Sequence, residues 1–338
     1  MRAIVTTSNG DVGVMKVETR PDPVPGRGEV LIRVKASGLN FADILARQGL
    51  YPDAPPKPCV MGYEVSGVIE AVGDGVDQTI IGEPVIAMTR FGGQAELVVV
   101  PDAQLFEKPE QLSFEQGAAL PVNYLTAWAL IVNMGGLKAD EAILIHNAGG
   151  GVGLAALDIA KHIGARTFGT ASAGKHEFLK QRGLDHAIDY RDQDWLPVLL
   201  ELTDGRGVEL VIDPLGGESW KKSYRALRHT GRMGVFGMSV ASASGIRGKL
   251  RALQAVLFMP RFNPLGLMNR NKGVFGLNLG HMWGEGAKVA GWTGEIMRGV
   301  QQGWIRPQVD RAFPFDQIQE AHRYIEARKN IGKVVLIP

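Results

Sequence analysis

A glycine-rich turn lies between two segments of contrasting pattern. Residues 142–147 form a short, mainly apolar run, and from Gly153 onward apolar residues recur at helical spacing. Ala148, Gly150 and Gly153 fill the small-residue positions of a dinucleotide fingerprint, which permit a tight turn, close approach of a pyrophosphate and close helix–strand packing. Such a pattern also occurs in ordinary loops, but four further strand signals follow it. We therefore expect a dinucleotide site here, contacted by Asn147, Ala148, Gly150, Gly151, Val152 and Gly153.

The rest of the chain divides into two regions of different character. Strand-like runs at 166–172, 186–190, 208–215 and 232–238 alternate with helical patterns, and 273–279 could add a sixth strand. This rhythm predicts an α/β fold with a doubly wound parallel sheet of the Rossmann type. Earlier residues form short strands between Gly and Pro, with a helix at 41–48, and suit a β-rich, barrel-like domain. The closing strand, 332–337, is expected to return to this first domain.

Cysteine and histidine content argue against disulfides and metal. Cys59 is the only cysteine, so no internal disulfide forms and a reducing compartment is the simpler reading. The seven histidines are scattered without ligand spacing, which predicts no metal site. The amino terminus lacks a signal-peptide core, and no apolar run of about twenty residues occurs. We expect a cytoplasmic protein.

The residues beyond the turn predict which dinucleotide binds. Folds that bind NAD normally place Asp or Glu about twenty residues after the turn, on the ribose hydroxyls. Here Ser172 stands nineteen residues after Gly153, and Lys175 follows it. A serine and a lysine would bind a 2′-phosphate that a carboxylate would repel. The prediction is NADPH/NADP, although Lys175 could simply be a solvated lysine.

Positive charge is concentrated in one segment. Residues 219–284 contain eleven Lys and Arg and no Asp or Glu. Within them, 239–272 is longer than an ordinary loop and combines Arg247, Lys249 and Arg251 with an apolar helical face formed by Leu250, Leu253, Val256 and Leu257. We favour packing of this insertion over a substrate cleft or on a partner subunit. A weak contact with an anionic membrane is the alternative.

Several motifs together are typical of a known family, and they lie at 38–43, 48–51, 62–67, 119–127, 146–153, 169–176, 213–217 and 330–333. The sequence is similar to the zinc-free quinone oxidoreductase (zeta-crystallin-like) branch of the medium-chain dehydrogenase/reductase superfamily, and within it to the vesicle amine transport protein group. The resemblance implies a GroES-like catalytic domain interrupted by a Rossmann domain, a site in the cleft between them, and a homodimer formed through edge strands. The expected division is 1–122 with 281–338, and 123–280.

The same resemblance implies roles for individual residues. Asn40, Tyr51 and Thr126 match cleft residues beside the nicotinamide. Asn40 and Tyr63 match positions that hold zinc ligands in metal-dependent relatives, and neither suits zinc. Asn123 departs from the family, where many members have a lysine that contacts cofactor. The remaining expected cofactor contacts are Ser172, Lys175 and Tyr190 at the 2′-phosphate, and Phe236, Gly237, Leu277 and Asn278 around the nicotinamide.

These features predict an NADPH-dependent, zinc-independent reductase of small apolar quinones or α,β-unsaturated carbonyl compounds (enones). Reduction builds negative charge on an oxygen, and Tyr51 and Asn40 are the expected hydrogen-bond donors to it, unless both only bond to cofactor or backbone. His146 is expected to be structural. The alternative is a non-catalytic NADPH-binding protein that associates with membranes. Nucleic-acid binding is not expected, since no aromatic–basic repeat occurs.

Overall fold

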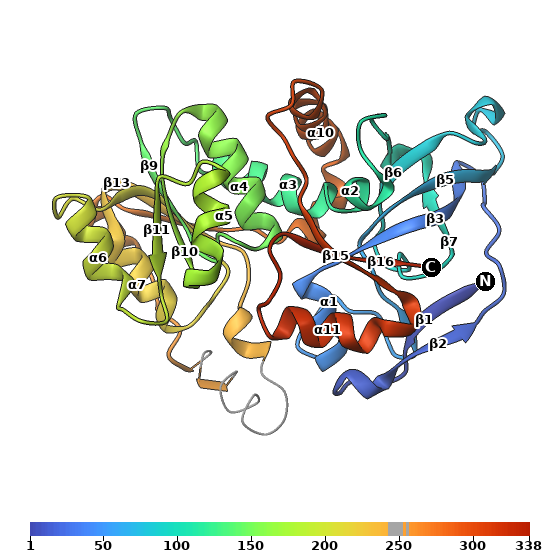
Figure 1. The fold of residues 1–338 in the computed structure, drawn as a ribbon, viewed down its shortest axis with the longest axis horizontal. Helices are drawn as coiled ribbons and strands as arrows, with labels where there is room; N and C mark the ends of the chain where they lie inside the picture. The colour runs from blue at the N-terminus through green and yellow to red at the C-terminus, as the bar shows by residue number, and fades with distance from the viewer. Residues whose placement is uncertain (243–252, 255–256) are drawn as a thin grey trace. The chain divides into compact units, whose positions relative to one another are not determined.

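The computed structural model describes residues 1–242, 253–254 and 257–338, which form two compact units (Figure 1). Unit 1 contains Met1–Asn123, Met282–Gln301 and Pro307–Pro338, and unit 2 contains Tyr124–His281 and Gln302–Arg306. The segment 302–306 therefore groups with unit 2, although it lies within the range expected for the first domain. Whether the two units fold as separate domains with the expected boundaries stays a prediction.

Unit 2 is built on a six-stranded parallel sheet, which confirms the predicted Rossmann type. The strand order is β11-β10-β9-β12-β13-β14, so the order reverses direction beside β9. The strands are β9 (Ala142–Ile145), β10 (Arg166–Ala171), β11 (His186–Asp189), β12 (Val208–Asp213), β13 (Leu227–Val235) and β14 (Gly273–Gly276), and every pairing is parallel.

Helices cover this sheet and complete the core of unit 2. All six residues of β12 are buried, as expected for a parallel strand covered on both faces. Phe168, Trp195 and Met233 belong to one cluster of buried side chains from strands and helices. The helices are α3 (Pro121–Trp128), which begins in unit 1, α4 (Gly151–Ile163), α5 (His176–Gln181), α6 (Trp195–Leu202), α7 (Glu218–Ala226) and α9 (Pro264–Arg270).

Unit 1 is β-rich, as predicted, and contains two sheets. The larger has the order β15-β16-β3-β5-β6-β8, with β7 also paired to β3, and the smaller has the order β2-β1-β4. The strands are β1 (Arg2–Thr6), β2 (Met15–Thr19), β3 (Glu29–Leu39), β4 (Cys59–Val60), β5 (Glu64–Val72), β6 (Pro84–Met88), β7 (Leu97–Pro101), β8 (Leu105–Glu107), β15 (Val309–Pro314) and β16 (Lys333–Ile337).

The carboxyl-terminal strand returns to unit 1, as the sequence predicted. β16 pairs antiparallel with β3, with Val335 opposite Gly38, and β3 pairs on its other side with β5. These pairings bring the first residues of β16 and β5 close to the end of β3. The helices of unit 1 are α1 (Phe41–Gln48), α2 (Phe114–Ala118), α10 (Gly286–Gln301) and α11 (Ile318–Glu326).

The predicted helix at 41–48 is confirmed, and its ends follow local rules. The Asp43 carboxylate accepts a hydrogen bond from the backbone amide of Asn40 at 2.8 Å, which satisfies a donor at the helix start. Gly49 ends the helix in the left-handed region, at a φ of 76°. Asn40 therefore lies where β3 ends and α1 begins.

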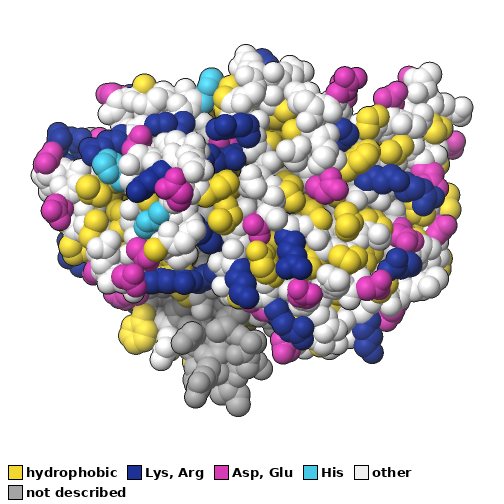
Figure 2. Space-filling model, in the orientation of Figure 1, with side chains coloured by type: hydrophobic (Ala, Val, Ile, Leu, Met, Phe, Trp, Pro, Cys, Tyr) yellow, Lys and Arg dark blue, Asp and Glu magenta, His cyan; other side chains and the backbone are white. Residues whose placement is uncertain are grey.

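The basic insertion is described only in part. Arg247, Lys249, Leu250, Arg251 and Val256 lie outside the described residues. In the part of the chain that the structure does describe, no helix is long and apolar enough to cross a membrane. Figure 2 shows basic and acidic side chains interspersed with hydrophobic ones over the face in view.

Candidate cofactor and active site

The glycine-rich turn joins β9 to α4. Asn147 adopts the left-handed conformation at a φ of 54°, and its carbonyl accepts a hydrogen bond from the amide of Gly150 at 2.9 Å. A Cβ atom on Gly153 would lie 2.4 Å from the carbonyl oxygen of Asn147 and 2.6 Å from that of Ala148. Only glycine therefore allows α4 to start this close to the turn.

The start of α4 is suited to bind an anion. Gly150 is the N-cap residue, so no side chain caps the first amides of the helix. The partial positive charge of the helix amino terminus adds to these N–H donors. The turn and α4 therefore fit the pyrophosphate of a dinucleotide.

The other expected cofactor residues follow the carboxyl ends of strands in the same sheet. Ser172 follows β10, and Tyr190 follows β11. Because all strands are parallel, these ends lie on the same edge of the sheet as the glycine-rich turn. Thr126 instead lies buried on α3. Phe236 and Gly237 follow β13, and Leu277 and Asn278 follow β14.

Lys175 lies beside the glycine-rich turn. A Cβ atom on Gly149 would be 2.8 Å from Cδ of Lys175, so the lysine stem passes directly over that glycine. Ser172 precedes the short 3₁₀ turn Ala173–Lys175, and both Ser172 and Lys175 are half-buried. The structure thus brings a cation and a hydroxyl to the segment predicted to hold the 2′-phosphate.

The sequence did not predict one carboxylate that lies beside the 3₁₀ turn Ala173–Lys175. Asp189, the last residue of β11, accepts a hydrogen bond from the amide of Ala173 at 2.9 Å. The amide of Arg191 also donates to it, and this bond holds the pKa of Asp189 below its ordinary value. A search for acids within about twenty residues of the glycine-rich turn cannot find Asp189, because it comes from the next strand.

His146, the residue between β9 and the glycine-rich turn, is buried. Its Nδ1 lies 2.9 Å from the hydroxyl of Thr170, and its Nε2 lies 3.0 Å from the hydroxyl of Ser223. Ser223 in turn donates to Asp213 at 2.6 Å. Burial lowers the pKa of His146, so the ring is neutral near pH 7. These contacts fit the structural role expected for this histidine.

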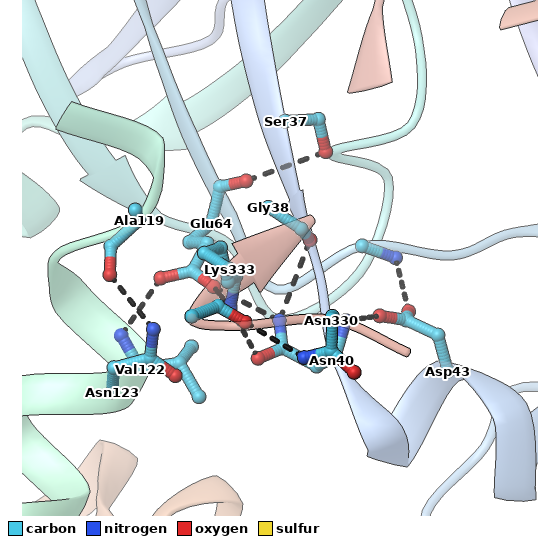
Figure 3. Close-up of polar contacts among 12 residues, drawn as sticks. Ser37, Gly38, Asn40, Asp43, Glu64, Ala119, Val122, Asn123, Asn330 and Lys333 are labelled. Carbon is cyan, nitrogen blue, oxygen red and sulfur yellow. Dashed lines mark hydrogen bonds and ion pairs between the residues drawn. The ribbon is translucent and has the colours of Figure 1, made fainter. Parts of the chain in front are cut away.

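In unit 1, Asn40 belongs to a buried polar network (Figure 3). Its Oδ1 accepts a hydrogen bond from Nζ of Lys333 at 2.6 Å, and its Nδ2 donates to Oε1 of Glu64 at 2.9 Å. Nδ2 also lies 3.4 Å from the carbonyl oxygen of Gly38. Lys333 forms an ion pair with Glu64, whose other oxygen accepts a bond from the amide of Val122 at 2.8 Å.

Strand pairing positions this network. Glu64 is the first residue of β5 and Lys333 the first of β16, and β3 lies between these strands. A Cβ atom on Gly38 of β3 would be 2.5 Å from Oε1 of Glu64, so glycine is required to admit the carboxylate. The sequence reasoning missed Glu64 and Lys333 as site residues, although both occur in motifs that carry the family resemblance.

Asp43 lies next to this network and is completely buried. Its two oxygens accept hydrogen bonds from the amides of Asn40, at 2.8 Å, and Gly62, at 3.1 Å. Desolvation outweighs these bonds and raises the pKa of Asp43 to about 7.

Tyr51 belongs to an aromatic cluster in unit 1. Its ring centroid is 6.2 Å from that of Tyr63 in an edge arrangement, and Tyr63 is 5.3 Å from Phe91. The Tyr63 hydroxyl is buried and has no hydrogen-bond partner among the described residues. Asn123, at the position where a lysine was noted in relatives, donates instead to the carbonyl of Ala119 at 2.9 Å.

The residues around Asn40 do not fit a zinc ion. Within the described ranges, no group of three or more His, Cys, Asp or Glu side chains could hold a metal. The Glu64 carboxylate is already paired with the Lys333 ammonium. A metal at this place would have to compete with a cation supplied by the protein itself.

A Rossmann-type sheet with a glycine-rich turn, together with a β-rich unit, defines the class: a dinucleotide-dependent oxidoreductase. Residues 26–110 match the alcohol dehydrogenase GroES-like domain, and residues 182–336 match the zinc-binding dehydrogenase family. The chain belongs to the medium-chain dehydrogenase/reductase superfamily, in the quinone oxidoreductase-like branch that includes the VAT-1 homologues.

Two relatives that match this chain along its whole length support its assignment to this branch. The chain is 40% identical to the rat (Rattus norvegicus) synaptic vesicle membrane protein VAT-1 homolog, across 100% of this chain and 84% of the relative. It is 30% identical to human (Homo sapiens) quinone oxidoreductase, across 100% of this chain and 98% of that protein.

Solved structures give the same assignment. Escherichia coli quinone oxidoreductase complexed with NADPH matches with a TM-score of 0.88 and 29% identity, with both chains covered completely. A mycobacterial protein complexed with NADPH matches with a TM-score of 0.88 and 31% identity, again over 100% of both chains. The CurK enoyl reductase matches with a TM-score of 0.87 and 28% identity, over 99% of this chain and 98% of that one.

Proposed function

We propose that this protein is an NADPH-dependent, zinc-independent reductase of quinones or α,β-unsaturated carbonyl compounds. The observation that carries the proposal is the glycine-rich turn at the start of α4, with the Lys175 stem lying against Gly149. The NADPH complexes of similar quinone oxidoreductase structures support the choice of cofactor.

The residues at the carboxyl edge of the unit 2 sheet would bind this cofactor. Backbone amides at Gly150–Gly153 would hold the pyrophosphate, with Asn147 and Ala148 forming the bend. Ser172, Lys175 and Tyr190 would contact the 2′-phosphate, where the lysine supplies the charge-assisted bond. The nicotinamide half would lie against Thr126, Phe236, Gly237, Leu277 and Asn278. Bound NADPH supplies the hydride that reduces the substrate.

The protein's part in the chemistry is to stabilise charge on the substrate oxygen. Adding hydride to a carbon conjugated with a carbonyl places negative charge on that oxygen, which then needs hydrogen-bond donors. The Tyr51 hydroxyl is one proposed donor. Asn40 is the other, through the Nδ2 hydrogen that, among the described residues, faces the carbonyl of Gly38 at 3.4 Å, the long limit of a hydrogen bond.

A direct assay tests this function. Purified protein should oxidise NADPH when given simple quinones or enones, with saturation in both reactants and with no loss after treatment with a zinc chelator. NADPH binding without turnover on any such acceptor would reject the reductase proposal. Activity that disappears with the chelator and returns with zinc would reject its metal independence.

We also propose a cytoplasmic homodimer that pairs through the edge of the unit 2 sheet. Among the described residues, β14 pairs with β13 on one side only, which leaves the other edge open for a second copy. Sedimentation of the intact protein checks this proposal: a species of twice the chain mass is expected, and a monomer at micromolar concentration would contradict it.

The exposed apolar residues near α9 favour a second candidate function, that of a non-catalytic NADPH-binding protein that associates with membranes or vesicles. Leu257 is 68% exposed, Phe258 61% and Leu265 68%, in a segment of the chain that carries no acidic residue. A basic apolar surface can bind anionic lipid. Co-sedimentation with anionic liposomes at physiological salt should occur under this alternative and should fail after deletion of 247–268.

A further inference from the structure

The ammonium group of Lys333 lies against the amide of Asn40 in unit 1. Lys333 is 3% exposed and Asn40 8%, and the 2.6 Å bond between Nζ and Oδ1 is short for an N–H···O bond (Figure 3). A charged donor of this kind makes a hydrogen bond roughly twice as strong as a neutral one. The contact is therefore one of two charge-assisted bonds that hold the asparagine, the other being from Nδ2 to the Glu64 carboxylate.

The charges of Lys333 and Glu64 together determine which way the Asn40 amide faces. An ammonium has three N–H donors and no acceptor, so only the amide oxygen can point toward it. Nδ2 must then face Glu64 and Gly38, as observed at 2.9 and 3.4 Å. One amide hydrogen is held by the carboxylate, and the other has the long contact to the Gly38 carbonyl.

The same bond changes the strength of that second donor. A hydrogen bond from a cation to the amide oxygen draws electron density from the nitrogen, so the N–H group becomes a better donor, as in other polarised hydrogen-bond chains. Burial increases the effect, because little water screens the charge.

We propose that Lys333 is a positioning residue for the reaction: it orients and polarises Asn40 so that the amide donates to the substrate carbonyl oxygen. This inference rests on the proposed reductase function and on the role of Asn40 within it. Glu64 completes the arrangement by neutralising Lys333 and by holding the first amide hydrogen.

A double-mutant cycle separates this role from a purely structural one. We compare kcat for enone reduction at saturating NADPH in the wild type, Lys333→Met, Asn40→Ala and the double variant. Lys333→Met should lower kcat by about tenfold, because Asn40 becomes a weaker and less firmly oriented donor; complete loss of one donor to a developing oxyanion costs about 10²–10³-fold in kcat. In the Asn40→Ala background the same substitution should have no further effect, because the residue through which Lys333 acts is already absent.

The controls address folding and charge. Lys108 is the matched lysine: it is buried in the same unit, and it donates hydrogen bonds to the backbone carbonyls of Pro109 and Leu112. Lys108→Met should show no Asn40-dependent loss of kcat. Lys333→Met combined with Glu64→Gln avoids leaving a buried carboxylate unpaired and should show the same loss as Lys333→Met. Lys333→Met and Lys108→Met should each keep the wild-type NADPH dissociation constant.

The possible outcomes are distinct. If Lys333→Met lowers kcat equally with and without Asn40, Lys333 does not act through Asn40 and the inference is wrong. If Asn40→Ala alone keeps full kcat, both the Asn40 assignment and this inference fail, while reductase activity itself stands. If the wild type shows no turnover at all, the proposed function fails first.

Discussion

Asp43 shows how burial alters a single carboxyl group. Its pKa is raised to about 7 because no solvent reaches the charge, even though two backbone amides and Lys333 favour the ionised form. Asp43 is the third residue of α1, and no pattern in the sequence indicates that its carboxyl group is buried. The positions of Glu64 and Lys333 beside Asn40 could not be predicted from the sequence either, because only the pairing of β3 with β5 and β16 brings them there.

The raised pKa of Asp43 makes stability depend on pH. Between about pH 4 and 7 the folded state holds a proton on Asp43 that the unfolded chain has released, so the contribution of Asp43 to stability falls as pH rises. Urea unfolding of the wild type and Asp43→Asn checks this. The free energy of unfolding of the wild type minus that of the variant should decrease by ~2–4 kcal/mol from pH 4.5 to 8. A flat or rising difference would show that Asp43 is ionised throughout.

At the scale of helices and strands, the sequence predicted those elements whose spacing, capping residues or glycines are visible locally. The helix at 41–48 and the β9–turn–α4 unit follow from spacing, capping and glycine positions. β13 begins at Leu227, five residues before the expected start at 232, because Leu227 pairs with Val208 of β12 and the polar residues between carry no strand pattern. The π-helical turn Ala129–Asn133 after α3 also lacked a sequence signal.

The contact between the glycine-rich turn and α4 can be tested at Gly153. Gly153→Ala places a methyl group within 2.6 Å of two backbone carbonyl oxygens, so α4 must move away from the turn. Thermal unfolding should show that the free energy of unfolding is about 1–3 kcal/mol lower than in the wild type. Calorimetric titration should show that the affinity for NADPH is reduced about tenfold or more.

Gly291→Ala in α10 is the control for this substitution, because nothing lies within 4 Å of the added methyl group. Its stability should be unchanged or slightly higher, since alanine favours a helix over glycine. Wild-type stability and NADPH affinity in Gly153→Ala would mean that the turn is looser than its backbone contacts require.

At the scale of the whole molecule, composition and rhythm predicted one β-rich and one Rossmann-type unit, and the family comparisons confirm both. The return of segment 302–306 to unit 2 could not be predicted, because it depends on long-range contacts. Trp304 stacks on His162 at 3.9 Å, and the amide of Arg306 bonds to Asp158 at 3.3 Å. Part of the basic insertion at 239–272 lies outside the described residues, so its role as a lid over the substrate, a dimer contact or a membrane contact stays a proposal.

The preference for NADPH over NADH depends on the positive charge of Lys175 beside the glycine-rich turn. Lys175 lies against Gly149, where a third phosphate would add a charge-assisted bond worth about 1.5–3 kcal/mol. Lys180, exposed on α5, provides a matched control for the loss of a lysine.

The most direct measurement is the pair of dissociation constants for NADPH and NADH in the wild type, Lys175→Ala and Lys180→Ala. We expect the wild type to prefer NADPH, and Lys175→Ala to weaken NADPH binding by about tenfold or more while leaving NADH nearly unchanged. Lys180→Ala should match the wild type for both. Equal losses for the two cofactors in Lys175→Ala, or no saturable binding of NADPH to the wild type, would contradict the account.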